Sequence, residues 1–187
     1  MQYKKKFVND KILQAGMNEY LDKGFRQGNI TTIAENAGVP VGNLYRYFNG
    51  KGGLLDALVK KTYQEFPKLI NQLASIDVVE TDISIEDLMQ RLTQMLLNIF
   101  EQHGKEIILM VDKCENTRYD DFAEKTIEQI AHLVFTKFYG KDATELDQMM
   151  SHICTKAFVN SMFDLLRMDL ETEKLEQIIS RVMNFYF

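Results

Sequence analysis

The sequence predicts an all-α protein. Apolar residues recur at spacings of three and four along most of the 187 residues, as they do on one face of a helix. No segment shows the strict alternation of apolar and polar residues that is typical of a half-buried strand. Five of the ten glycines and one of the two prolines lie in residues 38–53, so helix-interrupting residues are concentrated there. We therefore expect about nine helices and one short region of tight turns.

The first two helices have clear boundaries. The first is expected over residues 8–23, and Gly24 ends it. The second opens at Asn29, an N-cap residue, and Gly38 closes it in the left-handed conformation that favours glycine.

The remaining helices follow from the same apolar spacing. The third starts at Pro40, which needs no N–H partner there, and runs to about residue 47. The fourth starts near residue 51 and meets a kink or break at Pro67. Five further helices are expected over residues 84–103, 105–115, 119–139, 144–168 and 172–186.

Composition indicates a globular protein with an uneven charge. Residues 1–60 hold nine Lys/Arg and five Asp/Glu (+4), residues 61–187 hold thirteen and twenty-two (−9), and the total is −5. A basic head on an acidic body is expected if the head approaches a polyanion, although charge can also be uneven without function. No apolar run could span a membrane, and the basic N-terminus makes a poor signal peptide. Cys114 and Cys154 fit a reduced cytoplasmic protein, as buried thiols or as a disulfide.

Two short helices joined by a glycine turn indicate a helix-turn-helix, whose second helix enters the DNA major groove. At about 100° per residue, one arc of about 140° on the third helix carries small, aromatic and cationic residues. These residues are Val41, Gly42, Tyr45 and Arg46. Leu44 and Phe48 point the other way, toward the preceding helices. The alternative is an ordinary helical hairpin inside a bundle.

Each residue on the open face has a possible contact with DNA. Gly42 lets the backbone approach base edges, Val41 offers methyl groups to a thymine, and Arg46 reaches a phosphate or a guanine. Tyrosine hydroxyls and Lys51 suit phosphates. The residues predicted to contact DNA are Asn29, Thr31, Thr32, Pro40, Val41, Gly42, Asn43, Tyr45, Arg46, Tyr47 and Lys51.

The run NITTIAENAGVPVGNLYRYFNGKGGLLDAL resembles the N-terminal domain of the TetR (tetracycline repressor) family of transcription regulators. The matching positions are Ile33-Ala34, Ala37-Gly38-Val39, Gly42, Leu44-Tyr45, Tyr47-Phe48, Lys51 and Leu54-Leu55, together with Lys23-Gly24-Phe25 at the end of the first helix. The resemblance covers roughly residues 8–60. The rest of the chain resembles the family only in its helical character and length.

The resemblance implies a DNA-binding domain at residues 1–50 and a ligand-binding and dimerisation domain at residues 51–187. The helix near residues 51–66 would connect them, and its tilt would carry the ligand signal. The implied function is a ligand-responsive regulator, expected to act as a repressor, that binds a pseudo-palindromic double-stranded DNA operator as a homodimer through residues 144–186. A small apolar or amphipathic effector would release it. Effector contacts are predicted at Met95, Phe100, Met110, Cys114, Phe122, Met162 and Phe163, where plain core or interface packing is the alternative.

The sequence departs from the family pattern in two places. Pro40 stands where the family commonly has serine, so a side-chain cap is absent from the third helix. Gly50, Gly52 and Gly53 replace the usual cap and capping partner of the fourth helix. We therefore expect a weak first turn in the fourth helix and a compliant connection to the body.

Other functions have less support in the sequence. His103, His132 and His152 are too scattered to suggest a metal site, and no cofactor is expected. No nucleophile–base pair supports an enzyme. Lys4, Lys5 and Lys6 form either a solvated terminus or an arm that contacts phosphates. The alternative function is a helical protein-binding module that has kept the fold without sequence-specific DNA binding.

Overall fold

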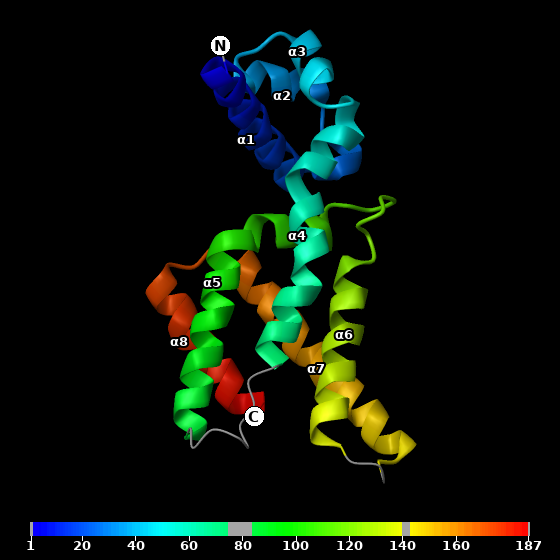
Figure 1. Ribbon diagram of the computed structural model, residues 1–187, viewed down its shortest axis with the longest axis vertical. Helices are drawn as coiled ribbons and strands as arrows, with labels where there is room; N and C mark the ends of the chain where they lie inside the picture. Colours follow the sequence, from blue (N-terminus) through cyan, green and yellow to red (C-terminus); the bar gives the residue numbers. More distant parts are fainter. Residues whose placement is uncertain (1, 75–83, 140–142, 187) are drawn as a thin grey trace. The chain divides into compact units, whose positions relative to one another are not determined.

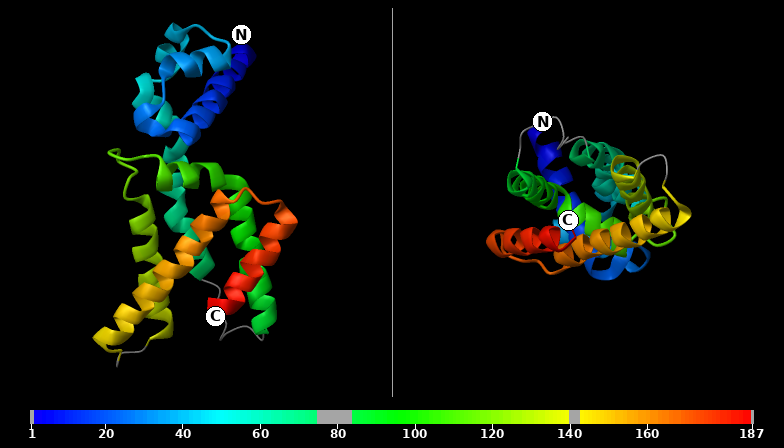
Figure 2. Two further views of the ribbon diagram at one scale, coloured as in Figure 1. Left: turned by 180° about the vertical axis from the view of Figure 1, so that it is seen from behind. Right: turned by 90° about the horizontal axis from the view of Figure 1, so that it is seen from below.

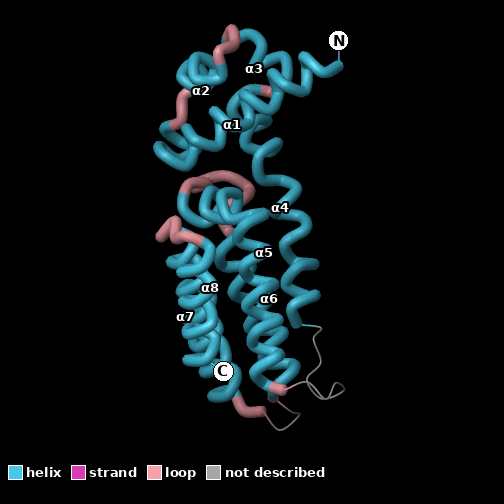
Figure 3. Tube along the Cα trace, turned by 90° about the vertical axis from the view of Figure 1, so that its left-hand side faces the viewer, coloured by secondary structure: helices cyan, strands magenta, loops and turns pink. Residues whose placement is uncertain are grey.

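The computed structural model describes residues 2–74, 84–139 and 143–186. These ranges contain eight helices and no strand, which confirms the all-α prediction (Figure 1, Figure 3). The helices are α1 (Gln2–Gln27), α2 (Ile30–Ala37), α3 (Val41–Tyr47), α4 (Gly50–Ala74), α5 (Ile85–Asp112), α6 (Phe122–Phe138), α7 (Glu145–Arg167) and α8 (Thr172–Tyr186).

The number of helices differs from the expected nine because α5 is continuous where two helices were predicted. Gly104, at the predicted boundary, is buried inside α5. A Cβ atom on Gly104 would lie 3.1 Å from Cδ2 of Leu166 in α7. The glycine therefore permits a close contact between helices instead of ending one.

The end of α1 follows the prediction at Gly24. This residue has a non-helical backbone (φ 76°, ψ 160°) and separates the last residues of α1 from its main body. The break turns the backbone N–H of Phe25 toward the carbonyl oxygen of Lys113, which accepts its hydrogen bond at 2.9 Å. At its other end α1 begins at Gln2, earlier than expected.

The fourth helix is not broken at Pro67. It passes through this residue and continues to Ala74, so of the two outcomes expected there the break does not occur. At its start, Gly50 has a φ of 69°, so this glycine makes a left-handed turn and does more than loosen the helix. Gly52 and Gly53 lie in the first turn with helical backbones, as expected for residues that weaken it.

The chain packs as two compact units. The first unit contains residues 1–64 and 105–121, and the second contains residues 65–104 and 122–187. Each of α4 and α5 therefore contributes residues to both units. Packing divides the chain after residues 64, 104 and 121. This division does not test the functional boundary at residue 50, which stays a prediction. Among the described residues, no helix is long and apolar enough to cross a membrane.

The two units have separate apolar cores. In the first, α1, α2, α3 and the start of α4 bury Ile12, Tyr20, Ile33, Leu44, Leu54 and Val59, together with Ile107, Leu109 and Met110 from α5. In the second, α6 packs along α7 (Figure 2). Small and polar residues are buried on these two helices, among them Thr126, Ala131, Ser151 and Thr155.

Candidate nucleic-acid interface

The helix-turn-helix has the predicted caps. The Oδ1 atom of Asn29 accepts a hydrogen bond from the backbone N–H of Thr31 at 2.8 Å, which caps α2. Gly38 is left-handed (φ 65°, ψ 37°), and its N–H donates to a carbonyl in the last turn of α2. Pro40 occupies the N-cap position of α3 without a side-chain cap, as predicted. These local contacts fix the turn between α2 and α3.

The two faces of α3 divide as predicted. Leu44 and Phe48 are buried, as are Ile33 and Ala34 of α2. On the opposite side Tyr45 is 61% exposed, and Arg46 is exposed as well. The apolar face anchors the helix, and the open face presents a phenol and a guanidinium to solvent.

Gly42 has open space around it. Apart from its two chain neighbours and the backbone of its own helix, no atom of the described chain lies within 4 Å of the position that a Cβ would take on Gly42. Nothing inside the unit therefore requires glycine at this position. The close approach of an external partner would be one reason for a glycine at this position.

The other predicted DNA contacts lie around this face. Thr31 and Pro40 are exposed, and Thr32, Val41, Asn43 and Tyr47 are half-buried. Asn29 is exposed, but its Oδ1 atom is already used as a cap. All eleven predicted residues lie in the first unit.

Glu19 is a structural contributor that the sequence analysis did not identify. It is only 5% exposed, and its Oε1 atom accepts a hydrogen bond from the backbone N–H of Asn29 at 3.1 Å. Lys23 Nζ lies 3.1 Å from the same oxygen. Glu19 thus ties α1 to the start of α2. The available signal was a carboxylate on the apolar face of α1, beside Tyr20 and with Lys23 four residues later.

Lys51 is engaged inside the unit. Its Nζ donates to the carbonyl oxygen of Arg26 at 2.9 Å and lies 5.0 Å from the ring centre of Phe25. Tyr20 is buried and donates from its hydroxyl to the carbonyl oxygen of Lys51 at 3.2 Å. Burial raises the pKa of Tyr20 and lowers the pKa of Lys51.

A polar cluster joins α4 to the loop before α6. Asp56 Oδ1 accepts a hydrogen bond from the hydroxyl of Tyr119 at 2.8 Å and pairs with Arg118 at 2.7 Å. The ring of Tyr63 meets that of Tyr119 edge to face, with centroids 5.1 Å apart. Burial, reinforced by Asp56, raises the pKa of Tyr119 to about 12.

The predicted effector residues are divided between the two units. Met110 and Cys114 lie in the first unit and are almost completely buried. Burial raises the pKa of the Cys114 thiol to about 12. The remaining five lie in the second unit. Met95 is half-buried, and the other four are buried: Phe100, Phe122, Met162 and Phe163.

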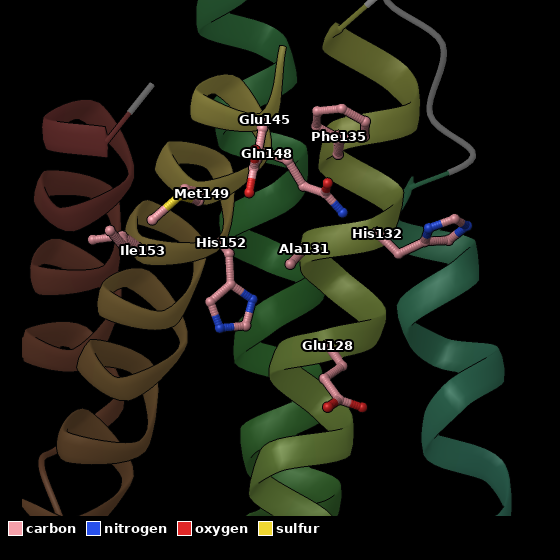
Figure 4. A pocket seen from close by; sticks show the side chains of 9 residues that line it. All are labelled: Glu128, Ala131, His132, Phe135, Glu145, Gln148, Met149, His152 and Ile153. Carbon is pink, nitrogen blue, oxygen red and sulfur yellow. The ribbon is translucent and has the colours of Figure 1, made fainter. Parts of the chain in front are cut away.

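A surface pocket of about 520 Å³ lies in the second unit and is lined by α6 and α7 (Figure 4). Its lining residues are Glu128, Ala131, His132, Phe135, Glu145, Gln148, Met149, His152 and Ile153. Gln148 extends from α7 toward α6, whereas His132 points away from α7. None of the seven predicted effector residues lines this pocket. In the part of the chain that the structure describes, no group of three His, Cys, Asp or Glu side chains could hold a metal ion.

Helix α7 is apolar on two opposite faces. One face carries the buried Val159 and Met162 and packs into the second unit. The other face is exposed and carries the stripe that we call the α7 stripe: Leu146 (76% exposed), Met149 (55%), Met150 (58%) and Ile153 (63%). Phe185 of α8 is also exposed. Exposed apolar stripes of this kind mark interaction surfaces.

Comparisons with known proteins agree with this geometry. Residues 12–58 match the sequence profile of bacterial regulatory proteins of the tetR family. The chain is 32% identical over 98 residues to the probable HTH-type transcriptional regulator YttP of Bacillus subtilis, a match that spans 52% of this chain and 44% of YttP.

Solved structures show the same fold over nearly the whole chain. A TetR-family transcriptional regulator from Bordetella parapertussis matches with a TM-score of 0.70 and 13% identity, covering 96% of this chain and 94% of that one. A transcriptional regulator from Aquifex aeolicus matches with a TM-score of 0.65 and 14% identity, covering 96% and 99%. Residues 12–58 therefore match the tetR family of bacterial regulatory proteins, and the chain has the fold of the solved transcriptional regulators.

Proposed function

We propose that this chain is a ligand-responsive, DNA-binding transcriptional regulator that represses transcription as a homodimer. The observation that carries the proposal is the open face of α3. It is anchored from behind by the buried Leu44, exposes Tyr45 and Arg46, and has no internal use for the glycine at position 42. A regulator of this kind acts on chromosomal DNA in the cytoplasm, and we propose no catalysis.

The proposed DNA contacts are those of the open face and its flanks. Arg46 would contact a phosphate or a guanine edge, and Tyr45 a phosphate. Gly42 would let the start of α3 approach the bases. Thr31, at the exposed start of α2, would contact the backbone on the other flank.

The proposed dimer interface is the α7 stripe together with α8. On α8, Leu175, Ile178 and Val182 are half-buried and Phe185 is exposed, at spacings of three and four that place them on one flank. Two copies related by a two-fold axis would bury these stripes against each other. A dimer also supplies the second recognition helix that a pseudo-palindromic operator needs, with half-sites about 34–36 Å apart or at multiples of that distance.

The proposed effector is a small apolar or amphipathic molecule that binds in the second unit. The five predicted effector residues of that unit supply apolar and deformable side chains, including Met162 and Phe163. To release DNA, the effector must bind the released conformation more tightly than the DNA-bound one.

The DNA-binding proposal is tested by fluorescence anisotropy on a DNA site that the wild-type chain selects from a random library. We expect salt-sensitive binding that prefers the selected site over scrambled DNA. Gly42→Leu should abolish this preference, because its side chain would occupy the space where the bases approach. The matched control is Ala57→Leu, which enlarges another exposed position in the same unit.

Two results would contradict the proposal. If the wild-type chain selects no sequence, a helical protein-binding module becomes the better explanation. If Gly42→Leu binds the selected site as tightly as the wild type, α3 does not dock through this face.

A further inference from the structure

We propose that Lys51 positions the helix-turn-helix from inside the first unit, instead of contacting a DNA phosphate. The inference rests on the proposed function, because it concerns how the DNA-reading helix is held. It replaces the phosphate contact that the sequence analysis predicts for this residue from its place at the start of a helix.

The first step is the chemistry at the end of α1. Carbonyl groups in the last turn of a helix have no intrahelical N–H partner, and a cation near them is favourable. Arg26 lies in that last turn, and its carbonyl oxygen accepts a hydrogen bond from Lys51 Nζ at 2.9 Å. The ammonium group also lies over the ring of Phe25, 5.0 Å from its centre, in cation–π contact. Lys51 therefore closes the C-terminus of α1.

The second step is that the contact is reciprocal. Tyr20 donates its hydroxyl hydrogen to the carbonyl oxygen of Lys51 at 3.2 Å, and its ring meets that of Phe25 edge to face at 5.7 Å. The backbone and the side chain of Lys51 are thus both bound to α1. In one hydrogen bond α1 supplies the donor, Tyr20, and in the other α4 supplies the donor, Lys51.

The third step concerns where α4 begins. Its first turn contains Gly52 and Gly53, which have low helix propensity. Only Phe48 and Asn49 separate it from the last residue of α3. The start of α4 therefore fixes the end of the recognition helix, and Lys51 supplies tertiary contacts where the local sequence is weak. The same ammonium group is partly desolvated, since burial lowers its pKa.

The test compares Lys51→Met with Arg46→Met, a matched control that removes a cation from the exposed face of α3. Lys51→Arg is a rescue variant, because a guanidinium can also donate to the Arg26 carbonyl. The wild-type chain first selects a DNA site from a random library. Affinities for that site and for scrambled DNA are then measured by anisotropy from 50 to 300 mM KCl at about 15 °C. Circular dichroism at the same temperature checks that each variant is folded.

We expect Lys51→Met to lower the melting temperature by several degrees and the affinity for the selected site about tenfold. Its affinity for scrambled DNA and the slope of log K against log salt should stay unchanged. Arg46→Met should keep the wild-type melting temperature and lose about 0.9 of that slope, as expected for one phosphate contact. Lys51→Arg should restore most of the affinity and the melting temperature.

Four results would overturn the inference in whole or in part. A salt slope reduced by about 0.9 with an unchanged melting temperature would make Lys51 a phosphate contact. A lower melting temperature with unchanged affinity for the selected site would make it a stabilising residue only. If the wild-type chain selects no DNA site and Lys51→Met keeps the wild-type melting temperature, both the internal contact of Lys51 and the proposed function are refuted. A lowered melting temperature in such a chain would leave the internal contact in place and refute the DNA-reading role.

Discussion

Replacing Ile153 with alanine should weaken the proposed dimer without unfolding the protein. Ile153 is the last residue of the α7 stripe and is 63% exposed in the single chain. Its removal leaves the buried face of α7 unchanged, because Val159 and Met162 lie on the other side of the helix. The substitution therefore affects an interface and spares the core.

The size of the effect follows from the exposed fraction. Complete burial of an isoleucine side chain stabilises by about 1.5–3 kcal/mol. Burying the exposed 63% of Ile153 should therefore contribute about 1–2 kcal/mol per copy. A two-fold dimer buries two copies, so the loss should be about 2–4 kcal/mol, which is roughly a 30- to 1,000-fold increase in the dimer dissociation constant.

Sedimentation equilibrium over a range of protein concentrations measures this constant directly. The matched control is Phe7→Ala, which removes a side chain of similar exposure (56%) from α1 and should leave the dimer constant unchanged. Thermal melts at high protein concentration check that both variants fold. A wild-type chain that stays monomeric, or an Ile153→Ala variant with the wild-type constant, would refute the assignment of the α7 stripe.

Two further predictions concern the first unit. Gly52→Ala should stabilise the protein by about 0.8–1 kcal/mol from helix propensity, because the new Cβ would meet no described atom within 4 Å beyond its chain neighbours and the backbone of its own helix. Denaturant melts should show a smaller gain for Gly53→Ala, whose Cβ would lie 3.3 Å from that of Asn49. An equal or larger gain for Gly53→Ala would contradict this reasoning. Burial raises the pKa of Cys114 from 9.0 to about 12, so the folded state keeps its thiol proton while the unfolded state loses it. Its stabilisation is complete below pH 9 and falls as pH rises toward 12, approaching about 1.4 kcal/mol per pH unit. Urea melts from pH 8 to 10.5 should show a steeper loss in the wild type and in Cys154→Ala, the exposed-thiol control, than in Cys114→Ala, which keeps the later loss that starts near pH 10 from the raised pKa values of Tyr20 and Tyr119. Equal slopes in all three would disprove it.

The features that the sequence predicted well are those that neighbouring residues decide. Asn29 caps α2 through a backbone N–H two residues away, and Gly38 ends it by its own backbone conformation. The division of α3 into a buried and an open face follows from helical spacing around Leu44. Each of these features is determined within a few residues of sequence.

The features that the sequence missed depend on residues far away in the chain. Gly104 lies inside α5 at a close contact with Leu166 of α7, which no local pattern could reveal. Lys51 lies at the start of a helix, where a phosphate contact was predicted, and only the fold shows its ammonium group beside the Arg26 carbonyl. Met110 and Cys114 have the apolar character of effector contacts, yet the topology places them in the first unit.

The first unit is built from two separate segments of the chain, and this has a consequence for biosynthesis. Besides residues 1–64, this unit contains residues 105–121, and Tyr119 and Arg118 bind Asp56 from that later segment. A ribosome must therefore synthesise the chain through residue 121 of 187 before the unit that carries the helix-turn-helix has all its parts. A fragment that stops after α4 would lack the partners of Asp56 and the carbonyl group that receives the Phe25 N–H. Nascent chains cannot complete the unit that carries the helix-turn-helix until much of the remaining protein has been made.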